Sequence, residues 1–217
     1  GVVIGFDGRH GSREFAADSA GILRSMGIRV YLYEDVCATP QLSHAIPFLG
    51  CAAGIMVTAS HNPPQDNGYK VYFDDGAQVV QPHANAIIEQ FNATPSESYE
   101  SLPADQQGEI TTVGEEFDEI YMKRLESLLL QPELVASQKD SLKIVFTNLH
   151  GTGGIISPVM LRRLGFQCST VTAQDTQDGR FPTVDSPNPE NAPALKMGID
   201  QANAEGADLV IATDPDR

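Results

Sequence analysis

The sequence lacks the features that define several classes of protein. It has only three cysteines, Cys37, Cys51 and Cys168, and no C-x-x-C pair. We therefore expect neither a disulfide framework nor a zinc cluster, but buried, reduced thiols. No window of eighteen apolar residues occurs, and the first residues lack the basic segment of a signal peptide. These absences predict a cytoplasmic protein that neither crosses nor binds a membrane.

Basic residues are also few. Fourteen Lys and Arg stand against 29 Asp and Glu, which gives a formal net charge of −15. A chain this acidic has no long-range attraction for nucleic acid or for anionic membrane surfaces, so we expect neither as a partner. Any phosphate that it binds must be held locally, by loop amides, a metal ion or a few placed cations.

The apolar segments predict the α/β class, because strand-like runs alternate with segments of helical spacing. Expected strands cover residues 2–6, 28–33, 53–58, 69–73, 142–147, 166–171 and 208–213. Expected helices cover 13–26 with Ser12 as N-cap, 39–46, 82–91, 116–130 behind a Thr112–Glu115 capping box, 155–164 and 193–204. Residues 92–112 are polar and predict a linker. We predict two sequential α/β domains with mixed sheets covered by helices, residues 1–105 and 106–217.

The first informative motif is TASHNPP, at residues 58–64, directly after a predicted buried strand. Ligands of open α/β sheets bind at this edge, and two prolines prevent the loop from continuing as strand or helix. Such a loop can present the hydroxyl of Ser60 for covalent catalysis. The alternative is a tight turn in which Ser60 and Asn62 cap backbone groups, and the residues alone favour it because no base is adjacent in sequence.

The second motif, Asp214-Pro215-Asp216-Arg217, follows another apolar strand. Two carboxylates at alternate loop positions suit a hard cation such as Mg²⁺, whereas the alternative is an ordinary Asp-Pro turn. A third segment, HGTGG at residues 150–154, resembles a phosphate-binding loop but matches no nucleotide-binding pattern. A tight turn that allows close packing is the favoured interpretation.

Together these segments resemble the α-D-phosphohexomutases, the phosphoglucomutase and phosphomannomutase superfamily. The similarity rests on TASHNP at residues 58–63, GFDGRHGS at 5–12, NGYK at 67–70 and FP…PNPE at 181–190, and it extends along nearly the whole chain. These motifs favour the phosphoglucomutase-2-like branch, which includes phosphopentomutases and a glucose-1,6-bisphosphate synthase. The chain would correspond to most of domains one and two, so we expect it to have little or no mutase turnover alone.

The resemblance implies a mechanism and a set of roles. Ser60 would carry a phosphoryl group, donate it to a sugar phosphate, and take the other phosphate back from the bisphosphate so formed. Mg²⁺ would be bound by Ser60, Asp214 and Asp216, and a sugar bisphosphate such as glucose 1,6-bisphosphate would act as activator. Lys70 would assist proton transfer or charge balance, and His61 would assist catalysis or brace the loop. These five residues form the predicted core of the site.

Two arginines complete the predicted site. By resemblance, Arg217 would contact the phosphoserine, and Arg9 would bind phosphate or form a structural ion pair. The family loop usually has three aspartates, as in DPDADR, whereas this sequence has two before Arg217. The leading hypothesis is a hexose or pentose phosphate mutase. The alternatives are a catalytically silent sugar-phosphate-binding relative and a bisphosphate synthase. The sequence does not specify an oligomeric state.

Overall fold

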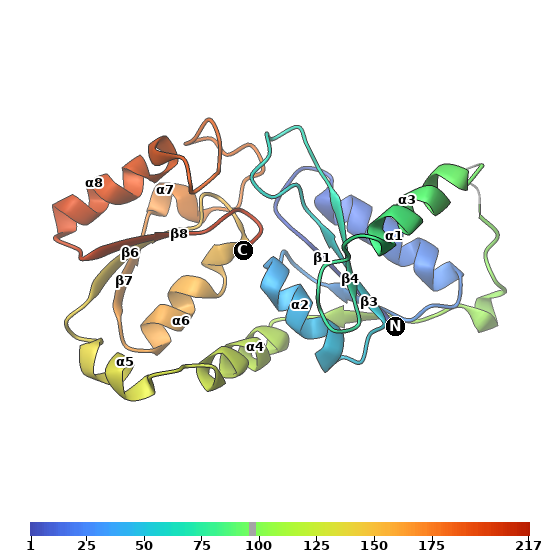
Figure 1. The fold of residues 1–217 in the computed structure, drawn as a ribbon, viewed down its shortest axis with the longest axis horizontal. Helices are drawn as coiled ribbons and strands as arrows, with labels where there is room; N and C mark the ends of the chain where they lie inside the picture. Colours follow the sequence, from blue (N-terminus) through green and yellow to red (C-terminus); the bar gives the residue numbers. More distant parts are fainter. Residues whose placement is uncertain (96–98) are drawn as a thin grey trace.

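The computed structural model describes residues 1–95 and 99–217, which form two α/β units side by side (Figure 1). The first unit has a five-stranded sheet in the order β4-β3-β1-β2-β5. Its strands are β1 (Val2–Phe6), β2 (Val30–Tyr33), β3 (Ala53–Val57), β4 (Tyr69–Phe73) and β5 (Ile110–Val113). All neighbours in this sheet are parallel except β3 and β4, which are antiparallel, so the sheet is mixed as predicted.

Helices cover both faces of this first sheet. Successive strand residues point to opposite faces, and accordingly Val3 and Ile4 belong to two separate apolar clusters. Helix α2 (Thr39–Phe48) packs with Leu42 against the Val3 face, and α1 (Ser12–Ser25) packs with two small residues, Ala16 and Ala20, against the other. The two clusters extend to the last residues of the strands, such as Phe6 and Val57, and the loops that leave these ends form the site.

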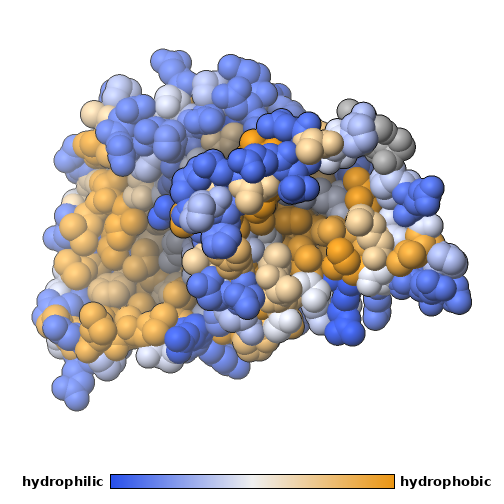
Figure 2. Space-filling view, turned by 45° about the vertical axis from the view of Figure 1, so that its right-hand side comes forward, coloured by the Kyte–Doolittle hydropathy of each residue, from blue (hydrophilic) through white to orange (hydrophobic). Residues whose placement is uncertain are grey.

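Helix α3 (His83–Ala93) differs from the other long helices because it buries none of its residues. Its Ile88 and Phe91 are 56% and 74% exposed. The view turned toward this side shows hydrophobic residues at the surface (Figure 2). A short 3-10 turn, η1 (Ala104–Gln106), follows later in the same connection. The helix predicted over residues 82–91 is confirmed by α3, but it contributes no residue to the buried core.

The second unit has a three-stranded, wholly parallel sheet in the order β7-β6-β8. Val145 and Phe146 of β6 point to opposite faces, toward α8 and α6 respectively. The strands are β6 (Lys143–Thr147), β7 (Gln167–Thr170) and β8 (Leu209–Ala212). The helices are α4 (Glu116–Ser127), α5 (Pro132–Gln138), α6 (Ser157–Arg163), α7 (Thr172–Asp175) and α8 (Lys196–Glu205), with 3-10 turns η2 (Thr152–Gly154) and η3 (Ala192–Leu195).

Several local predictions were wrong. Gly11, not Ser12, precedes the first turn of α1, and the Ser12 hydroxyl donates instead to Asp7 Oδ1 at 2.7 Å. The capping box is absent, because Thr112 lies within β5 and α4 begins at Glu116 without a side-chain cap. The expected linker over 92–112 ends in a strand, since β5 pairs with β2. The first sheet thus includes residues beyond the predicted division at 105 and 106.

The two sheets direct the carboxyl ends of β3 and β8 toward the junction between the units. The chain terminus that follows β8 lies between the two units (Figure 1). Loops at the carboxyl ends of parallel strands are where open α/β sheets bind ligands. None of the helices in the described ranges 1–95 and 99–217 is long and apolar enough to cross a bilayer.

Candidate active site

The serine loop, residues 58–68, connects β3 to the antiparallel β4. Ser60 adopts a left-handed backbone conformation with φ of 54°, which is uncommon for a residue with a side chain. The Thr58 hydroxyl accepts a hydrogen bond from the Ser60 amide at 2.9 Å and fixes this turn. A strained conformation of this kind persists only where the surroundings enforce it, and it presents the Ser60 hydroxyl to the second unit.

Arg9 holds much of the serine loop in this conformation. The residue is 4% exposed, and its guanidinium donates to the carbonyl oxygens of Ser60, Asn62, Pro63 and Asp66 at 2.6 to 3.0 Å. Its Nε lies 3.4 Å from a carboxylate oxygen of the buried Asp7. Burial lowers the pKa of Arg9, and the neighbouring carboxylates oppose that shift. These contacts favour the structural role of Arg9 over direct phosphate binding.

The aspartate loop, residues 213–217, follows β8 and is held mainly by its backbone. Thr152 N donates to Pro215 O at 2.8 Å, and Thr213 N donates to Thr147 O at 3.1 Å. A Cβ on Gly151 would lie 2.2 Å from Pro215 Cα, and a Cβ on Gly153 would lie 2.2 Å from a backbone oxygen of Arg217. The glycine-rich segment at 150–154 is therefore a close-packing turn, as favoured from the sequence, and it supports this loop.

The two loops meet at the Ser60 hydroxyl. Ser60 Oγ donates to Asp214 Oδ1 at 2.9 Å and lies 3.3 Å from Asp216 Oδ1. His61 Nδ1 lies 2.6 Å from Asp214 Oδ2. A serine on one sheet and two aspartates on the other thus form a single polar cluster, although about 150 residues separate them in sequence.

Asp216 is the most enclosed member of this cluster, at 1% exposed. Its Oδ2 accepts hydrogen bonds from Lys70 Nζ at 2.7 Å and from Thr39 Oγ1 at 3.1 Å. Burial favours the protonated form, but the Lys70 ammonium prevails and lowers the pKa of Asp216. The pKa of Asp214 is raised, first by burial and then by the adjacent Asp216 carboxylate. Of the two carboxyl groups, Asp214 is therefore the one that binds a proton more readily.

The donor atoms fit a hard divalent cation. Ser60 Oγ and the Oδ1 atoms of Asp214 and Asp216 converge, and Mg²⁺ prefers oxygen ligands in octahedral geometry. The raised pKa of Asp214 indicates negative charge that a cation would compensate. In the parts of the chain that the structure describes, no group of three or more His, Cys, Asp or Glu side chains is placed to hold a metal. Ser60, Asp214 and Asp216 are the residues that would hold such an ion.

The structure brings Ser60, His61, Lys70, Asp214 and Asp216 together. The two predicted arginines lie apart from the Ser60 hydroxyl. Arg9 is beneath the serine loop, and Arg217 is exposed and lines an apolar cavity of about 280 Å³ with Tyr121 and Met160. Sequence reasoning missed the contact of Thr39 with Asp216, because 177 residues separate the two and the threonine was interpreted only as the start of a helix.

Comparisons with known proteins show the family of the chain. The family model "Phosphoglucomutase/phosphomannomutase, alpha/beta/alpha domain I" matches residues 1–98, and the corresponding domain II model matches residues 119–217. The phosphoglucomutase of Staphylococcus epidermidis (strain ATCC 12228) is 41% identical over 99% of this chain, which covers 39% of that protein. A candidate phosphoribomutase of Schizosaccharomyces pombe is 37% identical over the entire chain, which covers 37% of it.

Comparison with solved structures indicates the same family. A candidate phosphomannomutase of Thermus thermophilus aligns with a TM-score of 0.80 at 30% identity, over 99% of this chain and 46% of that one. The chain belongs to the phosphoglucomutase/phosphomannomutase superfamily and comprises its domains I and II. It spans about two fifths of the length of the curated relatives that it matches.

Proposed function

We propose that this chain is the phosphoryl-carrying part of a phosphosugar mutase, which interconverts hexose or pentose 1-phosphates with the 6- or 5-phosphates. The observation that supports the proposal most strongly is the placement of the Ser60 hydroxyl against Asp214 and Asp216 of the other domain. Family membership alone does not require these side chains to meet. Their convergence is what a covalent phosphoserine mechanism needs, because positioning and charge stabilisation provide most of the catalysis in phosphoryl transfer.

In the proposed cycle Ser60 Oγ begins as a phosphate ester. A hydroxyl oxygen of the bound sugar phosphate forms a new bond to this phosphorus, and the Oγ–P bond breaks. The attacking hydroxyl gives up its proton and Ser60 Oγ gains one, so a sugar bisphosphate and a free Ser60 hydroxyl result. The bisphosphate turns over in the site and returns its other phosphate to Ser60. Mg²⁺, when bound by Ser60, Asp214 and Asp216, supplies positive charge next to the transferring group.

The remaining residues of the cluster support that transfer. Lys70 holds Asp216 in its charged form, and its side chain is 26% exposed. Its ammonium group can therefore also contact the phosphate or assist the proton transfer from the attacking hydroxyl. The ring of His61 is 44% exposed and braces Asp214, which sets the direction of the Asp214 carboxylate toward Ser60. We propose sugar phosphates as substrates, glucose 1,6-bisphosphate or a similar bisphosphate as activator, and the cytoplasm as the location.

The substrate can be a hexose or a pentose phosphate. Phosphoglucomutases and a candidate phosphoribomutase have similar identities to this chain, at 41% and 37%. This agrees with the narrower assignment to the phosphoglucomutase-2-like branch, which also includes a bisphosphate synthase. One observation favours the silent-relative alternative: the described residues supply only two carboxylates to the predicted metal site.

An assay of the gene product as expressed in its own cells tests the proposal. Glucose 1-phosphate, mannose 1-phosphate and ribose 1-phosphate are each supplied with Mg²⁺ and a trace of the bisphosphate. We expect turnover of at least one of them, loss of that turnover in Ser60→Ala, and normal turnover in Ser137→Ala, whose exposed serine donates to a carbonyl of its own helix. Absence of turnover with all three would support the silent relative, and bisphosphate formation from a separate donor would support the synthase.

A further inference from the structure

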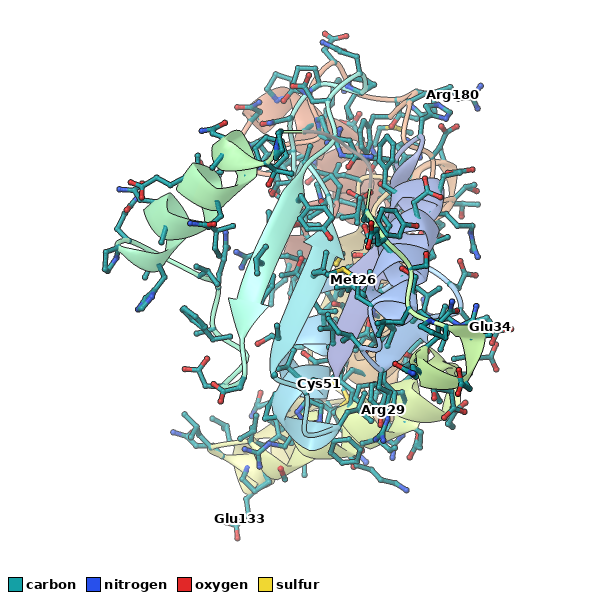
Figure 3. The ribbon with its side chains drawn as sticks, turned by 90° about the vertical axis from the view of Figure 1, so that its right-hand side faces the viewer. Met26, Arg29, Glu34, Cys51, Glu133 and Arg180 are labelled. Atoms are coloured by element: carbon teal, nitrogen blue, oxygen red, sulfur yellow. The ribbon has the colours of Figure 1, made fainter. Side chains whose placement is uncertain are left out.

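The loop that precedes α8 contains an unusual residue. Phe181 has φ of 50°, in the left-handed region that bulky residues rarely adopt, and yet its side chain is buried at 3% exposed. Its amide donates to Asp178 O at 2.9 Å, and its carbonyl accepts from Val184 N at 3.1 Å. The preceding Arg180 projects outward, 72% exposed at its side chain (Figure 3). The chain thus turns sharply at this point and places the phenyl ring inside the molecule.

The ring of Phe181 lies against Arg9 of the other domain. The guanidinium carbon of Arg9 is 5.0 Å from the ring centroid, within the range of a cation–π interaction. The backbones also approach closely, because a Cβ on Gly179 would lie 2.7 Å from Arg9 Cα. The same guanidinium donates to four carbonyl oxygens of the serine loop. Phe181 therefore covers a face of the group that holds Ser60 in position.

A polar network around the buried His150 and Gln174 holds the segment of Phe181 in turn. His150, itself 2% exposed, has its Nδ1 2.9 Å from Thr176 O and its Nε2 2.9 Å from Thr183 Oγ1. Gln174 Nε2 donates to the same Thr183 hydroxyl at 3.0 Å, and Thr147 Oγ1, at the end of β6, donates to Gln174 Oε1 at 2.6 Å. Polar networks whose buried members are hydrogen-bonded rigidify the segments that they join. The network ties residues 176–184 to the end of the central strand of the second sheet.

The second domain thus contacts the serine loop in two ways. Directly, Asp214 bonds to the Ser60 hydroxyl. Indirectly, Phe181 packs on Arg9, which bonds to the backbone of residues 60–66. Asp216 also links the domains through Lys70 and Thr39, but those bonds lie outside the serine loop. The Phe181 contact differs from them because it lies on the group that holds the serine-loop backbone. The aspartates and the serine hydroxyl must keep their relative orientation to form one site.

We propose that Phe181 is a positioning residue that sets the Arg9 guanidinium, and through it the serine loop, against the aspartate loop. Phe181 reaches the serine loop through Arg9, whose guanidinium bonds to the Ser60 carbonyl oxygen. Its importance for catalysis rests on the proposed mutase function, whereas its effect on the serine loop does not. The test is therefore made on the loop itself, and its failure would leave the proposed function standing.

The experiment measures amide hydrogen exchange in the peptide that covers residues 59–68 of the full chain. Phe181→Leu keeps a large apolar side chain but removes the aromatic face. We expect exchange in this peptide to become about fivefold to thirtyfold faster, as the loss of a desolvated cation–π contact implies. Phe181→Tyr retains the aromatic ring and should restore exchange to within about twofold of the wild type.

Phe146→Leu is the matched control, because Phe146 is a fully buried phenylalanine in the same domain that does not contact Arg9. It should leave the 59–68 peptide within about twofold of the wild type and accelerate exchange in β6. The proposal is overturned if Phe181→Leu leaves the loop unchanged, or if Phe146→Leu accelerates the loop equally.

If Phe181→Leu does not fold, Thr183→Val decides the question. It leaves the ring in place and removes the hydroxyl that links the segment to His150 and Gln174. Exchange in the 59–68 peptide should rise about threefold or more, because the segment loses its hydrogen bonds to the buried His150 and Gln174. Unchanged exchange there would overturn the proposal.

Discussion

The two loops that meet at Ser60 are held in place by different means. The serine loop is fixed by the side chain of Arg9, which bonds to four of its carbonyl oxygens. The aspartate loop is fixed by its own backbone, which packs against Gly151 and Gly153 at distances that leave no room for a Cβ. The first loop therefore depends on a particular charged group, and the second depends on the absence of side chains.

This difference predicts unequal sensitivity to substitution. Steric overlap with backbone cannot be relieved by a small rotation, whereas a lost hydrogen bond is partly replaced by water. The aspartate loop should consequently be the more fragile of the two. Substitutions that disturb its packing should therefore lower the free energy of unfolding of the chain, even without a substrate.

Gly151→Ala should have the largest effect. The new methyl group would overlap Pro215, whose backbone atoms lie 2.2 to 2.6 Å from its position, so the aspartate loop must move. We expect a loss of about 3 kcal/mol in the free energy of unfolding, measured by urea denaturation. Gly21→Ala is the control, since nothing lies within 4 Å of that position on α1. A Gly151→Ala variant as stable as the control would contradict the packing argument.

Arg9→Lys should rank second. A single ammonium cannot reach four carbonyl oxygens, so several polar atoms of the serine loop lose their partner. We expect a loss of about 2 kcal/mol in the same measurement. Arg24→Lys, on the exposed side of α1, should change the stability by less than about 0.5 kcal/mol. Equal effects of the two substitutions would show that Arg9 is not what holds the loop.

Thr39→Val tests the link between α2 and the aspartate loop. The substitution is nearly isosteric and removes the hydroxyl that donates to Asp216 Oδ2 at 3.1 Å. The loss should be about 1 kcal/mol in the urea unfolding curve. Thr112→Val serves as the control because Thr112 is exposed on β5. If both substitutions leave the stability unchanged, the side-chain contact of Thr39 contributes nothing.

Asp214→Asn should have the smallest effect, and it should be favourable in magnesium-free buffer. Burial and the Asp216 charge raise the pKa of Asp214, so its ionised form is destabilised in the folded state. At neutral pH the amide should increase stability by up to about 1 kcal/mol. The gain should shrink as the pH falls through the pKa of Asp214 in the folded state, because the wild-type carboxyl is then also uncharged. Added Mg²⁺ should reverse the order of stabilities, and a variant less stable than wild type at neutral pH without Mg²⁺ would refute this prediction.

The sequence predicted the central strands β1, β3 and β6 well because their apolar runs are almost wholly buried. The run at residues 53–58 became β3, and residues 69–73 became β4 as expected. Capping was predicted poorly, because Ser12 and Thr112 are equally suited to turns and strands and tertiary contacts decided their use. The strand β5 was missed since Ile110–Val113 is short, half-exposed and surrounded by polar residues.

The residues of the site that lie within recognisable sequence motifs were predictable. Ser60 and the two aspartates were identified from their loops and from the family resemblance, and the structure places them together. The roles of Thr39 and Phe181 were not predictable, since each acts on a residue more than 170 positions away. The structural role of Arg9 was equally hard to predict, because a buried arginine and a phosphate-binding arginine cannot be distinguished from the sequence alone.

The proposed function depends above all on Ser60 carrying the phosphoryl group. The most direct measurement is peptide-level mass spectrometry of the gene product, purified from its own cells in the presence of phosphatase inhibitors. We predict one phosphate per chain on the peptide that contains Ser60, lost in Ser60→Ala. An unmodified Ser60 in an otherwise active protein would contradict the phosphoserine mechanism and leave only the fold and family assignment in place.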